Sequence, residues 1–272
     1  MSRAPAAAKL NLALVVGPLR DDGKHEILTV LQRIDIVDRI ELEEAPALRV
    51  DGFAGETLVT TALRELARAA EVEPRWHVRI EKTIPVAAGL GGGSSDAATA
   101  LRLANATLRR PLAEDDLRRL AARVGADVPF FLTSGPQLGS GDGSELAPLD
   151  LPQDFWVVLL LPRGAAKTST ADVYAAFDSR HEVAGFAERR RALLDALDRV
   201  ERPRDLAALP PNDLTSSPLV EEIRAVGAFR ADVSGAGPGL YGLFHHRREA
   251  ARARRALRRL GRTWLTAPAW YG

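Results

Sequence analysis

Apolar and polar positions alternate along this chain with two periods, one of about two residues and one of about 3.6 residues. Residues 8–16 (AKLNLALVV) alternate at first and then run apolar, which predicts a strand. Residues 26–45 set Ile and Val against charged residues and are strand-rich, with an Asp-Gly turn before them. Residues 76–85 alternate in the same way, and the continuous apolar run at 155–162 is typical of a buried strand.

Other segments carry helical spacing. In 57–71, Leu58, Leu63 and Leu66 fall on one face of a helix. Residues 113–125 begin with acidic side chains and end at a glycine, as the helix dipole and the C-cap prefer. Helices are also predicted over 95–108, 168–177, 187–200 and 247–260, and a strand, a glycine turn and a second strand over 231–245.

These elements follow one another in a mixed order without an internal repeat. Strands and helices mixed in this way favour an α+β fold with two lobes. The segment LPQD at 151–154 is the predicted boundary, so that one lobe comprises residues 1–150 and the other residues 151–272.

Composition narrows the class of protein. The 272 residues are 46% apolar and 27% charged, with 37 Lys and Arg against 36 Asp and Glu, so no strong basic field points to nucleic acid or to a membrane surface. The Arg-rich helix at 247–260 has no interleaved aromatic residues, and we interpret it as a solvated helix. The chain has no cysteine, which excludes disulfides and thiolate metal sites. No apolar run reaches the ~18 residues that span a bilayer, so we expect a cytoplasmic protein without a membrane or nucleic-acid partner.

The stretch PVAAGLGGGSSDAATAL at 85–101 places four glycines and two serines between a predicted strand and a predicted helix. Successive backbone N–H groups in such a loop, with the free N–H groups of the first helical turn, form a cradle for an anion. Ser94 or Ser95 can cap the helix, and a serine hydroxyl can also reach a phosphate or Mg²⁺. The alternatives are a tight turn or a loop that packs against another chain.

The better-known phosphate motifs do not fit this stretch. A Walker A loop ends in Gly-Lys-Ser/Thr, and GGGSSD has no lysine. A dinucleotide-binding fingerprint requires a third glycine where Ser94 stands. The His-Arg-Asp and Asp-Phe-Gly segments of protein kinases are absent from the sequence. The stretch therefore favours a phosphate loop of another kind.

Lys9 and Asp127 are candidate catalytic residues. Taken alone, Lys9 is explained as a strand-edge lysine with its amine in water, and Asp127 as a turn or capping aspartate. Taken together, they suit phosphoryl transfer to an alcohol. An aspartate can accept the hydroxyl proton as general base, and an adjacent ammonium keeps that carboxylate ionised and steadies the charge on the phosphoryl group.

The motif PVAAGLGGGSSDAA resembles the central motif of the GHMP kinases, and its triple-glycine form is most similar to the branch that phosphorylates 4-diphosphocytidyl-2-C-methyl-D-erythritol. Other segments resemble that branch in the same order along almost the whole chain: APAAAKLNLALVV, RDDGKHEI, VGADVPFFL, TSTADVY, PND at 211–213 and SGAGPGLYGLF. The resemblance implies a two-lobed GHMP kinase fold, with a ribosomal protein S5 domain 2-like N-terminal lobe and a ferredoxin-like C-terminal lobe.

The resemblance also implies an activity and a set of site residues. It implies ATP-dependent phosphorylation of the 2-hydroxyl of a small-molecule substrate, with Mg²⁺ but without an assigned protein ligand for the metal, in a monomer or a homodimer. Lys9 and Asp127 would be catalytic, and Asn11, His25 and Tyr174 would bind the substrate. ATP would lie over a phosphate loop formed by Pro85, Val86, Ala87, Ala88, Gly89, Leu90, Gly91, Gly92, Gly93, Ser94 and Ser95.

Two departures from the family pattern leave alternatives open. Lys24 stands where the family usually carries a tyrosine that stacks on the cytosine, which motivates a kinase for another small alcohol. In the third glycine turn, Ala236 and Gly239 stand where the family usually carries hydroxyl side chains. That difference motivates a non-catalytic nucleotide-binding relative as a further alternative.

Overall fold

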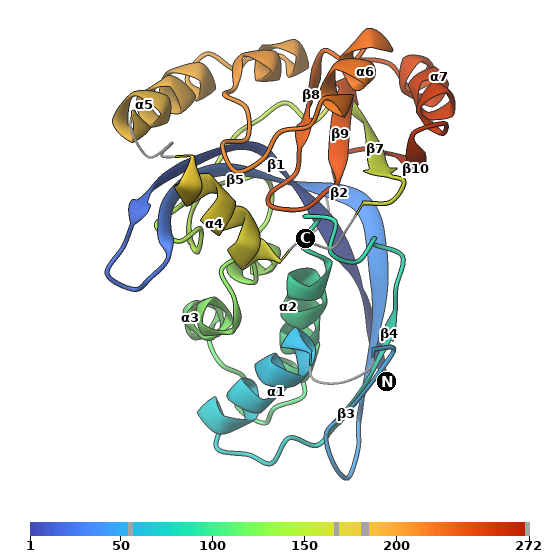
Figure 1. Ribbon diagram of the computed structural model, residues 1–272. Helices are drawn as coiled ribbons and strands as arrows, with labels where there is room; N and C mark the ends of the chain where they lie inside the picture. Colours follow the sequence, from blue (N-terminus) through green and yellow to red (C-terminus); the bar gives the residue numbers. More distant parts are fainter. Residues whose placement is uncertain (54–56, 166–168, 181–184, 270–272) are drawn as a thin grey trace.

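The computed structural model describes residues 1–53, 57–165, 169–180 and 185–269 and contains two β-sheets (Figure 1). The first sheet consists of β1 (Ser2–Leu19), β2 (His25–Glu44), β3 (Arg49–Asp51), β4 (Trp76–Glu81), β5 (Gln137–Ser140) and β6 (Glu145–Pro148). Its centre is β2, which pairs antiparallel with β1 on one edge and with β4 and β5 on the other. β3 joins β4 in parallel, and β6 joins β5 antiparallel.

The long β1–β2 ribbon carries the first predicted site residues. Every residue of β1 from Ala6 to Gly17 is buried, so both of its faces are covered. This explains why the alternation in 8–16 passes into a continuous apolar run. The outer edge of β1 faces the second lobe, where an isolated parallel bridge joins Leu14 to Asn212.

Three helices cover one face of the first sheet. They are α1 (Leu58–Ala69), α2 (Gly92–Asn105) and α3 (Glu114–Val124), and they are followed by the short 3₁₀ helix η1 (Pro129–Leu132). Figure 1 shows them gathered on one side of the long blue strands. Leu63 and Leu66 of α1 and Leu101 of α2 are fully buried in this layer, which holds α2 and the glycine stretch before it against the sheet.

The second sheet has the order β10-β7-β9-β8, and all of its neighbours are antiparallel. Its strands are β7 (Trp156–Pro162), β8 (Arg230–Val233), β9 (Leu240–Phe244) and β10 (Gly261–Thr266). The helices α6 (Leu219–Ala225) and α7 (Arg247–Leu257) complete a β-α-β-β-α-β arrangement, as expected for a ferredoxin-like lobe. Between β7 and α6 the chain adds α4 (Thr170–Ser179), α5 (Phe186–Leu197) and the 3₁₀ helix η2 (Pro203–Ala208).

The two faces of β7 explain how the lobes join. Val158 and Leu160 pack on one face with buried side chains of α6 and α7. Val157 and Leu159 point to the other face, into a core that also contains Leu10 and other buried residues of β1. One apolar core therefore continues from the first lobe into the second.

Most predicted elements are present, with several corrections. The helix expected from Ser95 begins three residues earlier at Gly92, and the strand expected over 76–85 ends at Glu81. Gly125 ends α3 with an extended backbone (φ 176°) and not in a left-handed cap. The helix expected over 168–177 begins at Thr170 after an N-cap at Ser169, and Thr168 lies outside the described residues. The sequence analysis did not find the short elements β3, β5, β6, α6 and β10.

The predicted boundary at 151–154 falls between β6 and β7, the last strand of the first sheet and the first strand of the second. In the described part of the chain, no helix is long and apolar enough to cross a membrane.

Candidate active site

A cavity of about 1100 Å³ opens where β1, the glycine stretch, the start of α2, α4 and the β8–β9 turn meet. Its lining brings together fifteen of the sixteen predicted site residues: Lys9, Asn11, His25, Pro85, Val86, Ala87, Ala88, Gly89, Leu90, Gly91, Gly92, Gly93, Ser94, Asp127 and Tyr174. Ser95 is the exception, because it is 1% exposed and packs inside the first turn of α2.

The glycine stretch enters α2 through a left-handed residue. Gly91 is the N-cap with φ 68° and ψ 16°, and no side chain caps the helix. The expected cap at Ser94 or Ser95 is therefore wrong, because glycine reaches the left-handed region easily and lets the helix begin early. The first N–H groups of a helix have no partner within it, so those of Gly92, Gly93 and Ser94 are free to bind an anion at the cavity.

A second glycine loop, the turn between β8 and β9, packs backbone to backbone against the first. A Cβ on Gly89 would lie 1.9 Å from the Ser234 carbonyl oxygen, and one on Gly237 would lie 2.1 Å from the Gly89 nitrogen. Gly239 N–H donates to the Ala88 carbonyl, and a Cβ there would lie 2.3 Å from that oxygen. The close contact between the loops leaves no room for a side chain at position 239. This explains why glycine stands where the family usually carries a hydroxyl side chain.

Lys9 lies at the inner end of the cavity with its side chain 5% exposed. Its Nζ donates to Asn11 Oδ1 at 2.6 Å and lies 3.5 Å from Asp127 Oδ2. Asn11 Nδ2 donates to Thr29 Oγ1 at 2.8 Å, and that hydroxyl donates to the Ala13 carbonyl. The ammonium is thus oriented by a short chain of hydrogen bonds across β1 and β2 and faces a carboxylate.

Asp127 reaches the site from the loop between α3 and η1. Its side chain is 42% exposed, so one side meets Lys9 while the other remains open to the cavity. Behind it, the Arg33 guanidinium donates to the Phe130 carbonyl at 2.6 Å and to the Thr133 carbonyl, which fixes η1. Burial, with the nearby Arg102 charge, lowers the pKa of Arg33 to about 10.

The opposite end of the cavity is formed by α4 and the start of β2. The Tyr174 and His25 rings stack with centroids 5.1 Å apart and planes 19° from parallel. His25 Nδ1 pairs with the Gly17 carbonyl at 2.8 Å, and Nε2 lies 3.2 Å from Asp178 Oδ1. Burial, with the charges of Asp127 and Asp142, raises the pKa of Tyr174 to about 12, so its phenol stays neutral near pH 7.

Lys24 also lines this end of the cavity, but it does not lie free in solvent. Its Nζ lies 2.5 Å from Asp142 Oδ2, and Asp142 is held in turn by the backbone N–H and the hydroxyl of Ser144. The ion pair links the β1–β2 turn to the β5–β6 turn. It places a paired charge where the family pattern would have a second aromatic ring.

A charged cluster lies beside the glycine stretch. Lys82 Nζ donates to Asp96 Oδ2 at 2.7 Å and also to Asp38, whose other oxygen accepts the N–H groups of Thr83 and Ile84. Asp38 and Asp96 are both almost completely buried. One ammonium therefore serves two buried carboxylates.

Three contributors to the site were missed in the sequence or given a lesser role. Asp178 lies four residues after Tyr174 on α4, so helical spacing alone could have placed the two on one face. Thr29 could be found only with the β1–β2 register, which shifts between Asn11 and Ala13. Asp96 could not be assigned to the site from the sequence, because nothing in the sequence brings Asp38 and Lys82 beside it.

Comparison with known proteins shows the family. The sequence profile described as GHMP kinases N terminal domain matches residues 57–135, and the one described as GHMP kinases C terminal matches residues 215–263. A 4-diphosphocytidyl-2-C-methyl-D-erythritol kinase of Geobacter sulfurreducens is 37% identical, over 96% of this chain and 96% of its own length. This chain belongs to the 4-diphosphocytidyl-2-C-methyl-D-erythritol kinases, a branch of the GHMP kinases. A second relative of this GHMP kinase, from Bacillus pumilus, is 36% identical over 93% of this chain and 91% of its own.

Solved structures agree with the GHMP kinase family. A crystal structure of 4-(cytidine 5'-diphospho)-2C-methyl-D-erythritol kinase is 32% identical and covers 98% of this chain and 99% of its own, with a TM-score of 0.79. A mevalonate kinase structure at 13% identity covers 98% of this chain and 99% of its own with a TM-score of 0.75, and so shares the fold. These similarities confirm the two-lobed GHMP kinase fold expected from the sequence.

Proposed function

We propose that this GHMP kinase transfers the γ-phosphoryl group of ATP to the 2-hydroxyl of 4-diphosphocytidyl-2-C-methyl-D-erythritol, a step of isoprenoid biosynthesis. The observation that carries the proposal is the Lys9–Asp127 pair, at 3.5 Å, in the same cavity as the glycine stretch. The named relatives support the choice of this alcohol.

The glycine stretch suits the phosphates of ATP. The first turn of α2 has backbone N–H groups without partners inside the helix, at residues that line the cavity, and the left-handed Gly89 and Gly91 let the loop pass close to the β8–β9 turn and to Lys9. Phe53, Leu58 and Val86 also line the cavity, and each of these side chains is more than a third exposed. Apolar surface of this kind suits the flat face of a purine base.

Mg²⁺ is proposed as the partner of the ATP phosphates. Within the described ranges, no group of three or more His, Asp or Glu side chains could hold a metal ion. Mg²⁺ commonly keeps several waters and takes ligands from substrate phosphates, so we assign it no protein ligand. When bound, it neutralises charge on the phosphate oxygens.

The chemistry on the protein side is carried by Asp127 and Lys9. Asp127 accepts the proton of the substrate hydroxyl, and the Lys9 ammonium, 3.5 Å from that carboxylate, faces the developing charge on the phosphoryl group. Both polar atoms of the Asn11 carboxamide have protein partners. This supports a role for Asn11 in orienting Lys9, in addition to its proposed contact with the substrate.

The cytidine end of the substrate is proposed to lie at Tyr174 and His25. The Tyr174 ring offers a face on which a base can stack. His25 Nδ1–H donates to the Gly17 carbonyl, which fixes the ring. Asp178, whose Oδ1 lies 3.2 Å from Nε2, adds a carboxylate that can accept from the exocyclic amine of cytosine.

The test is a coupled assay of ADP release with the diphosphocytidyl alcohol and a panel of other small alcohols. We expect turnover of the diphosphocytidyl alcohol, and a loss of about 10²-fold or more in kcat for Asp127→Asn with little change in ATP affinity. The exposed Asp150→Asn is the control and should retain the wild-type rate.

Each other outcome has a clear meaning. Turnover of a different alcohol only would refute the substrate and keep the kinase. An unchanged rate in Asp127→Asn would refute the proposed base. ATP binding without turnover of any alcohol would favour a nucleotide-binding relative.

A further inference from the structure

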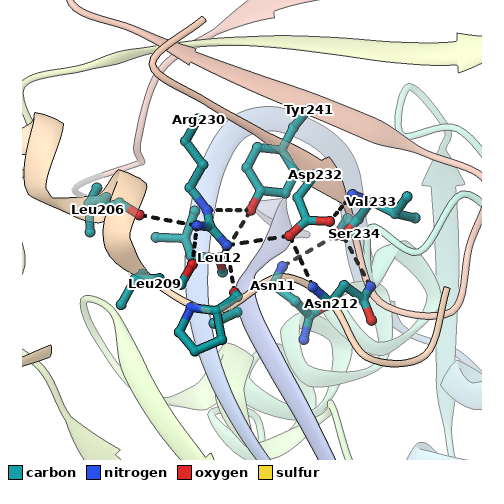
Figure 2. Close-up of polar contacts among 12 residues, drawn as sticks. Asn11, Leu12, Leu206, Leu209, Asn212, Arg230, Asp232, Val233, Ser234 and Tyr241 are labelled. Carbon is teal, nitrogen blue, oxygen red and sulfur yellow. Dashed lines mark hydrogen bonds and ion pairs between the residues drawn. The ribbon is translucent and has the colours of Figure 1, made fainter. Parts of the chain in front are cut away.

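A buried arginine outside the cavity joins the second lobe to β1 (Figure 2). Arg230, the first residue of β8, is 5% exposed. Its guanidinium donates to four backbone carbonyls, those of Leu12, Leu206, Leu209 and Pro210, and its Nε donates to the Tyr241 hydroxyl at 3.2 Å. The contacts to Leu209 and Pro210 measure 2.6 Å and 2.9 Å.

Such a group is costly to bury. Moving a guanidinium out of water is strongly unfavourable, and well-packed apolar residues often replace a buried ion pair without loss of stability. Here the charge is only loosely paired, since Arg230 Nη2 lies 3.4 Å from Asp232 Oδ2. Most of its hydrogen bonds instead reach neutral carbonyls. The arrangement therefore fixes geometry better than it adds stability.

The carbonyl at the β1 end of this network belongs to an irregular residue. The β1–β2 register shifts between Asn11 and Ala13, so Leu12 is the extra residue of a β-bulge and has no partner on β2. Its carbonyl accepts from Arg230 and also from the Tyr241 hydroxyl at 3.2 Å. Leu12 therefore has no paired residue on β2, and hydrogen bonds from Arg230 and Tyr241 of the second lobe hold its carbonyl instead.

A β-bulge changes the direction of the neighbouring side chains. Asn11 is the residue directly before the bulge at Leu12. Asn11 Oδ1 holds Lys9 Nζ at 2.6 Å. We propose that Arg230 is a positioning residue, which clamps the Leu12 bulge and so sets the direction of Asn11 and, through it, of the Lys9 ammonium. This proposal rests on the proposed function where the test measures turnover, but not where it measures the environment of Lys9.

The rest of the cluster holds Asn11 from its other side. Asp232 Oδ2 accepts the Asn212 N–H at 3.0 Å, and Asn212 Nδ2 donates to the Val233 and Gly235 carbonyls (Figure 2). This fixes the turn that carries Ser234. The Ser234 hydroxyl accepts the Asn11 N–H at 3.3 Å and donates to the Gly89 carbonyl at 3.0 Å. Residues of β8 and the turn after it therefore contact both ends of the Asn11–Leu12 segment.

The experiment compares Arg230→Lys and Tyr241→Phe with Thr266→Val. Arg230→Lys keeps the charge and loses the forked geometry, and Tyr241→Phe removes one donor to Leu12. Thr266→Val removes a buried hydroxyl of the same lobe, which donates to the Ala267 carbonyl. We expect kcat to fall about tenfold or more in Arg230→Lys and about fivefold in Tyr241→Phe, as for the loss of one hydrogen bond. We expect the KM for ATP to stay within about threefold, and Thr266→Val to match the wild type.

A readout without turnover separates this inference from the proposed function. The chain has four lysines, so ¹³C-lysine NMR can resolve the Lys9 Nζ environment, with Lys9→Arg for the assignment. We expect the Lys9 signal to shift in Arg230→Lys and Tyr241→Phe and to stay in place in Thr266→Val.

An unchanged Lys9 signal and an unchanged kcat in folded Tyr241→Phe would overturn the positioning role, even if Arg230→Lys does not fold. A changed KM or a loss of stability alone, with kcat and the Lys9 signal intact, would also overturn it. If the wild type turns over no alcohol, the proposed function fails, and the Lys9 signal still decides the role of Arg230.

Discussion

Asp96 is a buried acidic residue beside the glycine stretch, and binding of phosphate by that stretch does not explain its presence. It is 2% exposed, and its Oδ1 has no hydrogen-bond partner in the part of the chain that the structure describes. Burial raises the pKa of Asp96 to about 7; the Lys82 charge works against this rise, and the Asp38 charge adds to it. The carboxyl is therefore half-protonated near neutral pH, next to the proposed ATP site.

This gives a pH-dependent prediction for stability. The folded protein keeps the Asp96 proton up to about pH 7, whereas the unfolded chain releases it near 3.8. The free energy of unfolding of the wild type should thus fall as pH rises from about 4 to 7, by at most about 1.4 kcal/mol per pH unit for this one proton. Asp96→Asn lacks this proton, so it should gain stability relative to the wild type across that window and stay level above it. Urea unfolding at several pH values measures the difference.

The control for Asp96 is Asp150→Asn, which removes an exposed carboxylate. A stability difference between Asp96→Asn and the wild type that stays constant from pH 4 to 8 would contradict the raised pKa.

Tyr174 gives a second prediction for a single residue. Tyr174→Leu removes the aromatic face that α4 turns toward His25. Loss of a base–aromatic stack costs about 1–3 kcal/mol, so the KM for the diphosphocytidyl alcohol should rise between about 5-fold and 150-fold, with the KM for ATP unchanged. Ser179→Ala, at the exposed end of the same helix, serves as the comparison. Equal KM values in Tyr174→Leu and the wild type would place the base elsewhere.

Sequence alone was informative for residues whose chemistry is local. Lys9, Asp127 and the glycine stretch were predicted to share a site, and the cavity includes them. Arg230 could not be found in this way, because its partners lie far away in the sequence and depend on how β1 meets the second lobe. The helix cap expected at Ser94 or Ser95 was wrong because the left-handed Gly91 moves the start of the helix to Gly92.

At the scale of elements, the two glycine loops form one unit. Gly89→Ala places a Cβ 1.9 Å from the Ser234 carbonyl oxygen at a residue with φ 76°. Gly135→Ala places one at φ 66° with nothing within 4 Å. Both should lose ~1 kcal/mol from left-handed backbone, but only Gly89→Ala should also lose stability beyond that and raise the KM for ATP, because the loops must move apart. Denaturant unfolding and initial rates measure the two effects.

If Gly89→Ala and Gly135→Ala behave alike in both measurements, close packing of the two loops does not matter for nucleotide binding. An effect on ATP in Gly135→Ala would indicate a general change in the fold.

Long elements were predicted better than short ones. The helical face in 57–71 and the apolar run at 155–162 carry many periodic positions, and α1 and β7 follow them closely. β3, β5 and β6 have only three or four residues each, too few for a period to show. They exist because β4 and β2 offer edges with which to pair, and this is a tertiary effect.

The molecule as a whole has two lobes but a shared core, and this predicts a single unfolding transition. Leu159→Ala removes a buried side chain that faces β1 from the second lobe, and should cost about 2–5 kcal/mol. Trp76 reports on the first lobe and Trp264 on the second. In single-tryptophan variants, the urea midpoint at both probes should move down together. A first-lobe probe with an unchanged midpoint would show that the lobes unfold independently.

The boundary at 151–154 remains a prediction in this sense. The sequence indicated two lobes because strands and helices follow one another in a mixed order. It gave no sign that β1 completes its edge with polar groups from residues 212–241, since those contacts join positions about 200 residues apart. We therefore propose 1–150 and 151–272 as lobes of one cooperative unit.

The outer edge of β1, which the second lobe covers in the folded protein, also matters during biosynthesis. The strand that carries Lys9 is made before β2 and can pair with it almost at once, because only a short turn separates them. Arg230 and Tyr241, which bond its bulge at Leu12, are made more than 200 residues later. Until then the edge offers unpaired backbone groups to other nascent chains. Folding of the active site is thus post-translational, and chaperones that shield exposed strand edges should increase the yield of active enzyme.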